Sequence, residues 1–349
     1  MEVPKSEVKI EKIDVQDLPK GFERNANYIK CIECGDITEF VLLANKPKPI
    51  PITRITKDLY ADENGEIHEF NHSENKLTLG DSVRKTLSHL RAIINTNCSD
   101  DKKLKWITFT YAENMTDTKQ LYKDFDKFWK RFKYYSEKHN LPIPEYISVA
   151  EPQGRGAWHL HIIFIYPCKA PFIDNNKVLY PMWSHGYTKV KAVHGVDNLG
   201  AYFSAYLADI PLEEYERDAG DTAMYEIKSA VVVDDDGHDT EKKFVKGARL
   251  KFYPAGMNIY RTSRGIKQPT INQIDKKEYA TKKASAGTLT FSSACSVLSA
   301  SVSSSGSSGN GDKDEVLFQA VNYVYHAYYN RKRGQNQGGA GGNSLPVGR

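Results

Sequence analysis

The pattern of apolar and polar positions predicts alternating strands and helices in the middle of the chain. Four segments are rich in β-branched and aromatic residues and are expected to be strands: residues 106–111, 145–151, 157–166 and 186–193. A helix is expected over residues 82–95, where apolar residues recur at helical spacing. A longer amphipathic helix is expected to begin at Thr116 or Asp117 and to continue through Phe132, and Pro142 ends that segment.

Shorter elements are expected on the C-terminal side of these. They are a short helix near residues 176–183, a helix over 198–209 that begins at Asp197 and stops before Pro211, and a bent strand pair over 248–261 broken at 254–256. Residues 292–311 are rich in Ser and Gly and are expected to be flexible. Residues 316–329 can form a strand or a short helix, and residues 335–349 have the composition of a disordered tail. These shifts divide the chain into an accessory segment (1–80), a main domain (81–275), an extension (276–333) and a tail (334–349).

The charge of the chain permits a nucleic-acid partner without requiring one. The net charge is +4, and Lys and Arg are clustered rather than evenly spread. On the helix expected at 82–95, Arg84, Lys85 and Arg91 are predicted to face outward. This helix either contacts DNA or packs on the core with a solvated basic face.

The cysteines and the termini indicate the compartment. Five cysteines at irregular spacing do not form a disulfide framework, so a reducing cytoplasm is expected. No apolar run reaches transmembrane length, and the N-terminus lacks the apolar core of a signal peptide. Cys31 and Cys34 form a CxxC pair that could bind structural zinc with His68 and His72; the alternative is two ordinary reduced thiols.

His159-Leu160-His161 is the strongest candidate for chemistry. Side chains alternate along a strand, so both imidazoles point to one face, and a metal ion would pair with them. Glu151 closes the preceding strand, and a hairpin through residues 153–156 folds it back beside His159. Two imidazoles and one carboxylate form a ligand set with open positions, which suits Mg²⁺ or Mn²⁺, with Zn²⁺ as a further alternative.

Two tyrosines follow at helical spacing. Tyr202 and Tyr206 are four residues apart, so both phenols lie on one face of the expected helix. Such pairs usually pack in a core. A phenol is a poor nucleophile at neutral pH because its pKa is about 10, but beside a divalent metal it becomes a plausible one for a phosphodiester.

This ordered combination resembles the HUH endonuclease superfamily, and within it the rolling-circle replication initiators of Gram-positive plasmids, phages and integrative elements. The resemblance covers about residues 80–270. It rests on a strand ending in Tyr111, then Glu151-x7-His159-x-His161, then Tyr202-x3-Tyr206. Further stretches that carry it are residues 107–117, 154–161, 183–187, 196–202 and 262–269.

The resemblance implies an α+β fold with an antiparallel sheet of about five strands flanked by helices, in a ferredoxin-like or RRM-like layout. It implies that His159, His161 and Glu151 hold a divalent cation and that Tyr202 is the nucleophile, with Tyr206 as a second one. Many relatives carry Lys immediately before the second tyrosine, whereas this chain has Ala205, so Arg155 or Lys189 is a candidate substitute. The candidate DNA-binding residues are Arg84, Lys85, Arg91, Arg155, Lys189, Lys191, Arg264 and Lys267, and bases could stack on Tyr111, Trp158 or Tyr187.

The implied activity is metal-dependent nicking of one strand of origin DNA, single-stranded at the nick. The products are a 5′-phosphotyrosine link and a free 3′-OH, and the strand is later rejoined. No phosphate-binding GxxxxGK[ST] motif occurs, so a host helicase and a polymerase would act in trans, and no membrane is involved. The alternatives are a relaxase or a transposase of the same superfamily, a two-histidine-one-carboxylate oxygenase or cupin-like metal enzyme, and a DNA-binding replication adaptor without catalysis.

Overall fold

The computed structural model has a mixed α+β fold. It describes residues 12–14, 25–46, 52–70, 73–193, 199–200, 207–219, 226–233, 239–302 and 316–331. The chain divides into two compact units, one formed by Met1–Ile50 with Thr270–Gly339 and the other by Pro51–Pro269 with Ala340–Arg349. The division predicted at residues 80, 275 and 333 stays a prediction.

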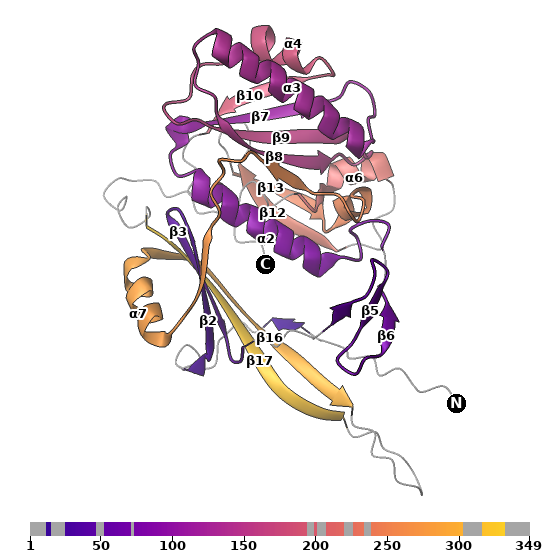
Figure 1. Ribbon diagram of the computed structural model, residues 1–349, viewed down its shortest axis with the longest axis vertical. Helices are drawn as coiled ribbons and strands as arrows, with labels where there is room; N and C mark the ends of the chain where they lie inside the picture. Colours follow the sequence, from indigo (N-terminus) through magenta and orange to yellow (C-terminus); the bar gives the residue numbers. More distant parts are fainter. Residues whose placement is uncertain are drawn as a thin grey trace, which may run out of the picture. The chain divides into compact units, whose positions relative to one another are not determined.

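A five-stranded antiparallel sheet forms the centre of the second unit (Figure 1). Its order is β10 (Thr188–Ala192), β7 (Leu104–Thr110), β9 (Trp158–Ile165), β8 (Glu145–Pro152) and β14 (Tyr260–Thr262). The four strands expected from the apolar pattern are therefore confirmed, as is the antiparallel sheet flanked by helices.

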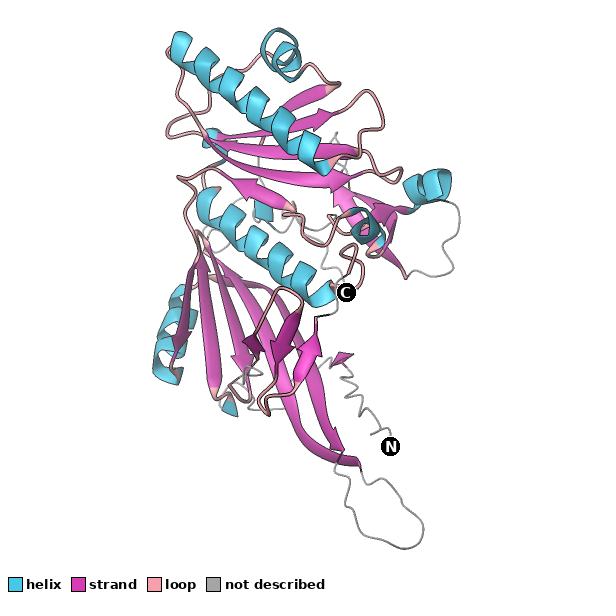
Figure 2. Ribbon diagram, turned by 45° about the vertical axis from the view of Figure 1, so that its right-hand side comes forward, coloured by secondary structure: helices cyan, strands magenta, loops and turns pink. Residues whose placement is uncertain are grey.

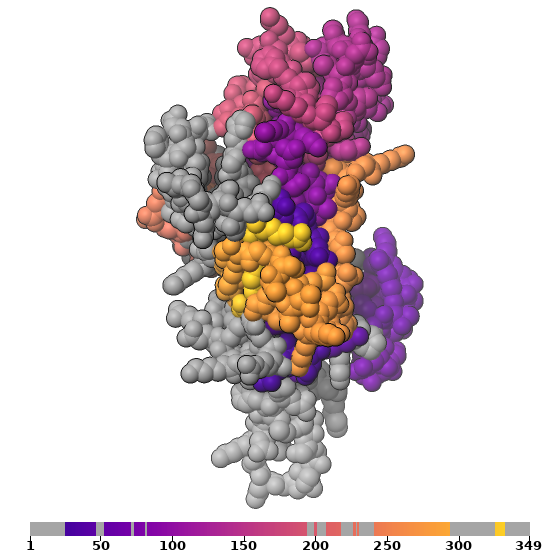
Figure 3. Space-filling view, turned by 90° about the vertical axis from the view of Figure 1, so that its left-hand side faces the viewer, coloured from indigo at the N-terminus to yellow at the C-terminus, as the bar shows by residue number. Residues whose placement is uncertain are grey.

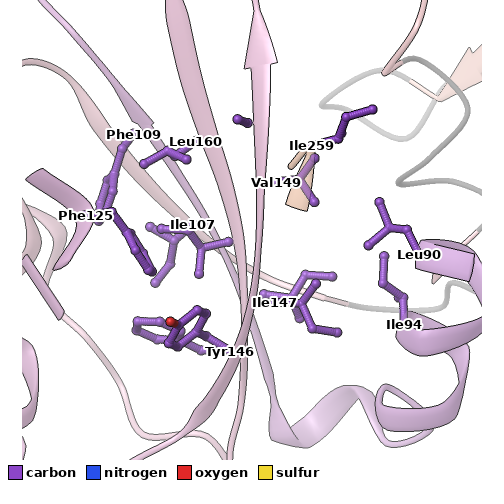
Figure 4. Packing of buried hydrophobic residues seen from close by; sticks show 14 of the residues in the cluster. Leu90, Ile94, Ile107, Phe109, Phe125, Tyr146, Ile147, Val149, Leu160 and Ile259 are labelled. Carbon is purple, nitrogen blue, oxygen red and sulfur yellow. The ribbon is translucent and has the colours of Figure 1, made fainter. Parts of the chain in front are cut away.

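Long helices cover both faces of this sheet (Figures 1 and 2). Helix α3 (Thr118–Lys138) begins at Asp117, whose side chain accepts hydrogen bonds from the backbone N–H groups of Lys119 and Gln120. Its Phe125 and Phe128 pack against Tyr146 and Phe109 on one face. Helix α2 (Gly80–Asn97) places its apolar side chains on the other face, where Figure 4 shows Leu90 and Ile94 beside Ile147 and Val149. One hydrophobic core therefore includes side chains from both faces of the sheet.

The connection between β8 and β9 is the expected tight hairpin. The N–H of Gln153 donates to the carbonyl of Ala157 (2.8 Å), and the N–H of Gly156 donates to the carbonyl of Gln153 (2.8 Å). Gly156 has a φ of +85°, which glycine adopts without strain. Between β9 and β10, a π-helical turn (Asn175–Leu179) runs into α4 (Tyr180–Trp183), close to the predicted short helix.

Two predictions for the C-terminal part of this unit are wrong. Residues 207–208 form a bend and β11 is Ile210–Pro211, so the expected helix does not reach Asp209. The carbonyls of Leu207, Ala208 and Asp209 instead accept hydrogen bonds from Tyr253 and Arg249, far along the chain. Residues 248–261 are not a strand pair either. Gly247 (φ +71°) starts a tight 3-10 turn, Ala248–Phe252, and only β14 is a strand.

The remaining elements of the second unit are small. Helix α6 (Leu212–Ala219) follows β11, which pairs with β13 (Asp239–Val245), itself paired with β12 (Ile227–Val233). A separate three-stranded sheet contains β4 (Thr53–Arg54), β5 (Leu59–Ala61) and β6 (Ile67–Glu69). Within the described residues, no helix combines the length and the apolar character that crossing a bilayer requires.

The first unit joins segments from both ends of the chain in one sheet. Its order is β1 (Lys12–Asp14), β16 (Thr288–Val302), β17 (Val316–Asn330), β3 (Ile37–Leu43), β2 (Tyr28–Cys34) and β15 (Thr270–Ile274). Helix α7 (Lys276–Ser285) packs its Tyr279 against Phe40. In Figure 3, orange and yellow surface from the C-terminal segments lies directly against indigo surface from the N-terminal strands.

The Ser/Gly-rich stretch is only in part what the composition suggested. Residues 292–302 belong to β16, which pairs along its length with β17, so the prediction of flexibility is wrong there. Serines are interspersed with Ala, Cys, Val and Leu in this part, and pairing with β17 supplies the backbone hydrogen bonds that an isolated segment would lack. Residues 303–311 and the tail 335–349 lie outside the described residues, whereas residues 316–329 form a strand, one of the two expected alternatives.

Candidate active site

The register of β8 and β9 brings the three expected ligands together. Glu151 is paired directly with His159, and His161 lies two residues further along β9. Because side chains alternate along a strand, Glu151, His159 and His161 share one face of the sheet. This is the face opposite Leu160, which Figure 4 shows on the Phe125 side, and it is the face that α2 partly covers.

The same face continues across two more strands. His159 is paired with Thr110 on β7, and backbone hydrogen bonding places Tyr187, just before β10, opposite Thr110. In the next row His161 is paired with Thr108, which is paired with Lys189. The sheet therefore presents a carboxylate, two imidazoles, two hydroxyls, a phenol ring and an ammonium group side by side.

His161 is held in place on both sides of its ring. Its Nε2 lies 2.6 Å from Oε2 of Glu151, and its Nδ1 lies 3.3 Å from Oγ1 of Thr108. The ring of Trp106 also packs against the imidazole in a T-shaped arrangement. The side chains of His161 and Glu151 keep 19% and 16% of their surface exposed, so solvent and ions reach this pair.

His159 stands slightly apart from that pair. Burial lowers the pKa of His159 to about 4, although the neighbouring carboxylate of Glu151 acts in the opposite direction, so the imidazole is neutral at pH 7. A neutral imidazole is the form that binds metal ions. The ring nitrogens of His159 do not lie within 4.8 Å of both the Glu151 and the His161 ligand atoms, which is the separation that ligands of one ion can have. The donor types and their shared face fit a divalent cation.

Arg249, on the 3-10 turn, is the main site residue that sequence reasoning missed. Its Nη1 lies 2.5 Å from Oε1 of Glu151, and its Nη2 lies 3.8 Å from Oε2 of Glu214. Burial by itself would raise the pKa of Glu151, but the charge of Arg249 and the hydrogen bond with His161 lower it to about 2. Glu151 is therefore ionised, with one oxygen bound to Arg249 and the other turned toward His161. No local motif marks Arg249, because its partners Glu214 and Glu151 lie about 35 and about 100 residues away in the sequence.

The two candidate tyrosines lie outside the described residues, as does Ala205, but the chain is described on both sides of them. Leu199 and Gly200 are helical, and the N–H of Gly200 donates to Oδ1 of Asn95 on α2 (2.9 Å). On the other side, the buried hydroxyl of Tyr253 lies 3.4 Å from the carbonyl of Leu207 and 2.8 Å from that of Ala150, the residue before Glu151. Tyr202 and Tyr206 are thus in a segment whose two ends are held against α2 and β8.

The expected DNA-binding residues fall into separate groups. Lys189 and Lys191 lie on β10, and the exposed Arg155 lies in the 153–156 hairpin, where its charge acts on His159. Arg84 and Lys85 are exposed on α2, and Arg91 is half-buried beside Ser88.

Arg264 and Lys267 are placed elsewhere. They belong to the loop in which Gly265 donates its N–H to Glu145, at the far end of β8. Glu145 is six residues from Glu151, which is about 20 Å along a strand. These two residues therefore do not belong to the histidine site.

Of the three expected stacking residues, one ring is free to stack. Trp158 is 1% exposed, and its indole N–H donates to the carbonyl of Thr116. The hydroxyl of Tyr111 donates to Asp124 (3.1 Å), and burial raises its pKa. Tyr187 is 60% exposed, in the same row as His159.

The CxxC pair has ordinary structural contacts. Cys31 packs in the core of the first unit, where burial raises its pKa to about 11, and the thiol of Cys34 donates to the carbonyl of Ile37 (3.4 Å). His68 lies in the second unit and His72 outside the described residues, so zinc at this pair stays a prediction. In the described part of the chain, three metal-type ligand atoms within 4.8 Å of one another occur at Asp62, Glu66 and His68, where Nε2 of His68 lies 3.2 Å from Asp62.

One family model matches the part of the chain that contains the candidate site. The family model named for the replication-associated protein ORF2 matches residues 104–210, which run from the start of β7 to the start of β11 and contain Glu151, His159, His161, Tyr202 and Tyr206. This match supports a role in replication for the chain. No curated protein and no solved structure matches it.

Proposed function

We propose that this protein is a replication initiator that nicks one strand of origin DNA by tyrosine transesterification. The observation that carries the proposal is the direct pairing of Glu151 with His159 on the face that also holds His161, inside the segment matched by the replication-associated family. In this proposal Glu151, His159 and His161 hold Mg²⁺ or Mn²⁺. A divalent cation bound there would polarise the phosphate oxygens of the DNA strand.

The chain's own residues perform the transfer. The phenol oxygen of Tyr202 attacks the phosphorus, the bond between phosphorus and the 3′ oxygen breaks, and the proton lost by the phenol is balanced by the one that the 3′ oxygen gains. The products are a 5′-phosphotyrosine and a free 3′-OH, from which a polymerase can extend. One phosphodiester replaces another, so rejoining needs only attack by a 3′-OH on the phosphotyrosine. Tyr206 is the proposed second nucleophile.

The surrounding face supports binding of a single strand. Lys189, Lys191 and Arg155 supply positive charge around the histidines, and salt-dependent phosphate contacts of this kind provide most non-specific affinity for nucleic acids. Unwinding of the origin would come from a host helicase in trans.

A second candidate function follows from a specific observation. The carboxylate of Glu151 already pairs with His161 and Arg249, and His161 also contacts the hydroxyl of Thr108, as in a structural network. A replication adaptor that binds DNA without cutting it would need nothing more.

The test uses the full chain and a supercoiled plasmid that carries its gene with the flanking DNA. We expect conversion to nicked circles with Mn²⁺ or Mg²⁺, none with EDTA, and a DNA–protein adduct that survives detergent. Tyr202→Phe should abolish the adduct, whereas Tyr134→Phe, an exposed phenol on α3, should not. Metal-dependent adduct formation by Tyr202→Phe would show that another nucleophile acts. Origin binding without metal-dependent nicking would establish the adaptor.

A further inference from the structure

The guanidinium of Arg249 joins two segments that are distant in sequence. It is 5% exposed, and besides the ion pair with Glu151 its Nη1 donates to the carbonyl of Pro152 (2.5 Å) while its Nε donates to the carbonyl of Asp209. Glu151 and Pro152 are the last two residues of β8. Asp209 follows the segment that contains Tyr202 and Tyr206. The buried guanidinium of Arg249 therefore binds both the carboxylate of the candidate site and the chain three residues after the second tyrosine.

The backbone around Arg249 reinforces the same connection. Its own N–H donates to the carbonyl of Ala208 (3.0 Å), and the N–H of Gly247 donates to Oδ1 of Asp209 (2.7 Å). Glu214 completes the network, because its Oε1 accepts from the N–H of Gly154 (2.7 Å) while its Oε2 faces Arg249. The 3-10 turn, the end of β8 and residues 207–209 thus form one hydrogen-bonded junction.

We propose that Arg249 is a positioning residue that sets both halves of the active site at once. It holds Glu151 with a single oxygen turned toward His161 and the proposed metal ion, and it anchors the chain after the tyrosines to that same carboxylate. The inference rests on the proposed function for its metal and tyrosine roles, whereas the junction itself is a property of the fold.

The geometry of the guanidinium explains why arginine is needed. It offers a planar fork of donors, which here serves a carboxylate and two carbonyls in different directions. Lysine carries the same charge as a single point on a flexible stem, so it can pair with Glu151 but cannot hold Pro152 and Asp209 in place as well. Arg249→Lys therefore separates the charge from the positioning.

The experiment compares Arg249→Lys with Arg131→Lys in the full chain. Arg131 also donates to a main-chain carbonyl, that of Met182 (2.7 Å), but lies on α3. Mn²⁺ affinity is measured by electron paramagnetic resonance, and backbone hydrogen exchange is measured in peptides that contain residues 207–210. We expect Arg249→Lys to weaken Mn²⁺ binding by about 10–100-fold, as for other residues that orient metal ligands, and to speed exchange in those peptides. Arg131→Lys should change neither.

The wild-type protein provides a measurement that does not depend on the variant folding. If Arg249 couples the two segments, adding Mn²⁺ to wild type should slow exchange at residues 207–210. The inference is overturned if Mn²⁺ binds without that slowing, or if a folded Arg249→Lys protein matches wild type in affinity and exchange. Wild type that binds no Mn²⁺ would instead refute the metal site of the proposed function, and exchange in Arg249→Lys would still decide whether Arg249 anchors the bend.

Discussion

Replacing Gly200 with alanine should displace the segment that carries the tyrosines. A Cβ at this position would lie 2.4 Å from the carbonyl oxygen of Arg91 and 2.7 Å from Oδ1 of Asn95, both on α2. Separations below 3.0 Å are essentially never seen for real Cβ atoms. The Arg91 oxygen is part of the helix backbone, so the Leu199–Gly200 end must move away from α2.

The expected loss of folding stability is the sum of two contributions. Overpacking of a well-packed contact costs about 1–3 kcal/mol, and loss of the hydrogen bond from Gly200 to Asn95 costs about 1 kcal/mol. The expected destabilisation is therefore about 2–4 kcal/mol, which corresponds to a fall in Tm of roughly 5–15 °C for a unit of this size. A misplacement of about 1 Å at a catalytic group costs about 100-fold in rate, so adduct formation should fall by at least that factor.

Gly80 is the matched control, because a Cβ there would have no neighbour within 4 Å. Gly80→Ala should leave Tm unchanged or raise it slightly, since alanine lowers the entropy of the unfolded chain. All four tryptophans, Trp106, Trp129, Trp158 and Trp183, belong to the second unit, so their fluorescence reports its unfolding directly. If Gly200→Ala melts like Gly80→Ala and still forms the adduct at the wild-type rate, then the contact with α2 does not position the segment.

Three further predictions use side chains with contrasting environments. Burial lowers the pKa of His159 to about 4 in the folded protein, whereas a histidine in the unfolded chain has a pKa near 6.5. Between these pH values the unfolded state binds a proton that the folded state does not. The free energy of unfolding in EDTA should therefore fall by up to about 3 kcal/mol as the pH drops from 6.5 to 4. Urea unfolding across this range should show a shallower fall for His159→Gln; equal slopes would contradict the assignment. Tyr187→Ala should weaken binding of single-stranded oligonucleotides by about 5–150-fold, the range for one base stacked on an aromatic ring. The matched control is Tyr180→Ala, at a side chain that is 53% exposed on α4, and it should have little effect. Fluorescence anisotropy measures both affinities. At pH 8 iodoacetamide should label the exposed Cys168 while sparing Cys98 and Cys31, because burial raises their pKa to about 12 and about 11. Rapid labelling of Cys98, detected by mass spectrometry, would contradict its raised pKa.

The parts of the fold that could be read from the sequence are those with local signals. The apolar stripe from Leu121 to Phe132 has the helical period and Asp117 caps it, so the start of α3 is placed almost to the residue, whereas its end at Lys138 is not. The pairing of Glu151 with His159 was predictable because a short glycine-containing turn leaves little freedom of register. The sheet of the first unit was not predictable in this way, because β2 and β3 pair with β15 and β17, more than two hundred residues later.

The same distinction separates what was found from what was missed in the site. Glu151, His159 and His161 lie within eleven residues of one another, and a strand pattern is enough to put them on one face. Arg249 and Glu214 reach the site from a 3-10 turn and a helix, and each was hidden among ordinary surface charges in the sequence. The end of the tyrosine segment was misjudged for the same reason, since its carbonyls bond to Arg249 and Tyr253 rather than within a helix.

The charges at this junction suggest why a cation and DNA would bind together. Glu151 and Glu214 outnumber Arg249, and His159 is neutral at pH 7, so these described groups by themselves carry net negative charge and repel a phosphate. A divalent cation on the same face would reverse that sign, and Arg155 and Lys189 would then add to the attraction. On the proposed function, affinity for single-stranded DNA should therefore rise when Mn²⁺ is added to wild type, and the rise should be lost in Glu151→Gln. A rise of equal size in that variant, measured by fluorescence anisotropy at constant ionic strength, would place the cation elsewhere.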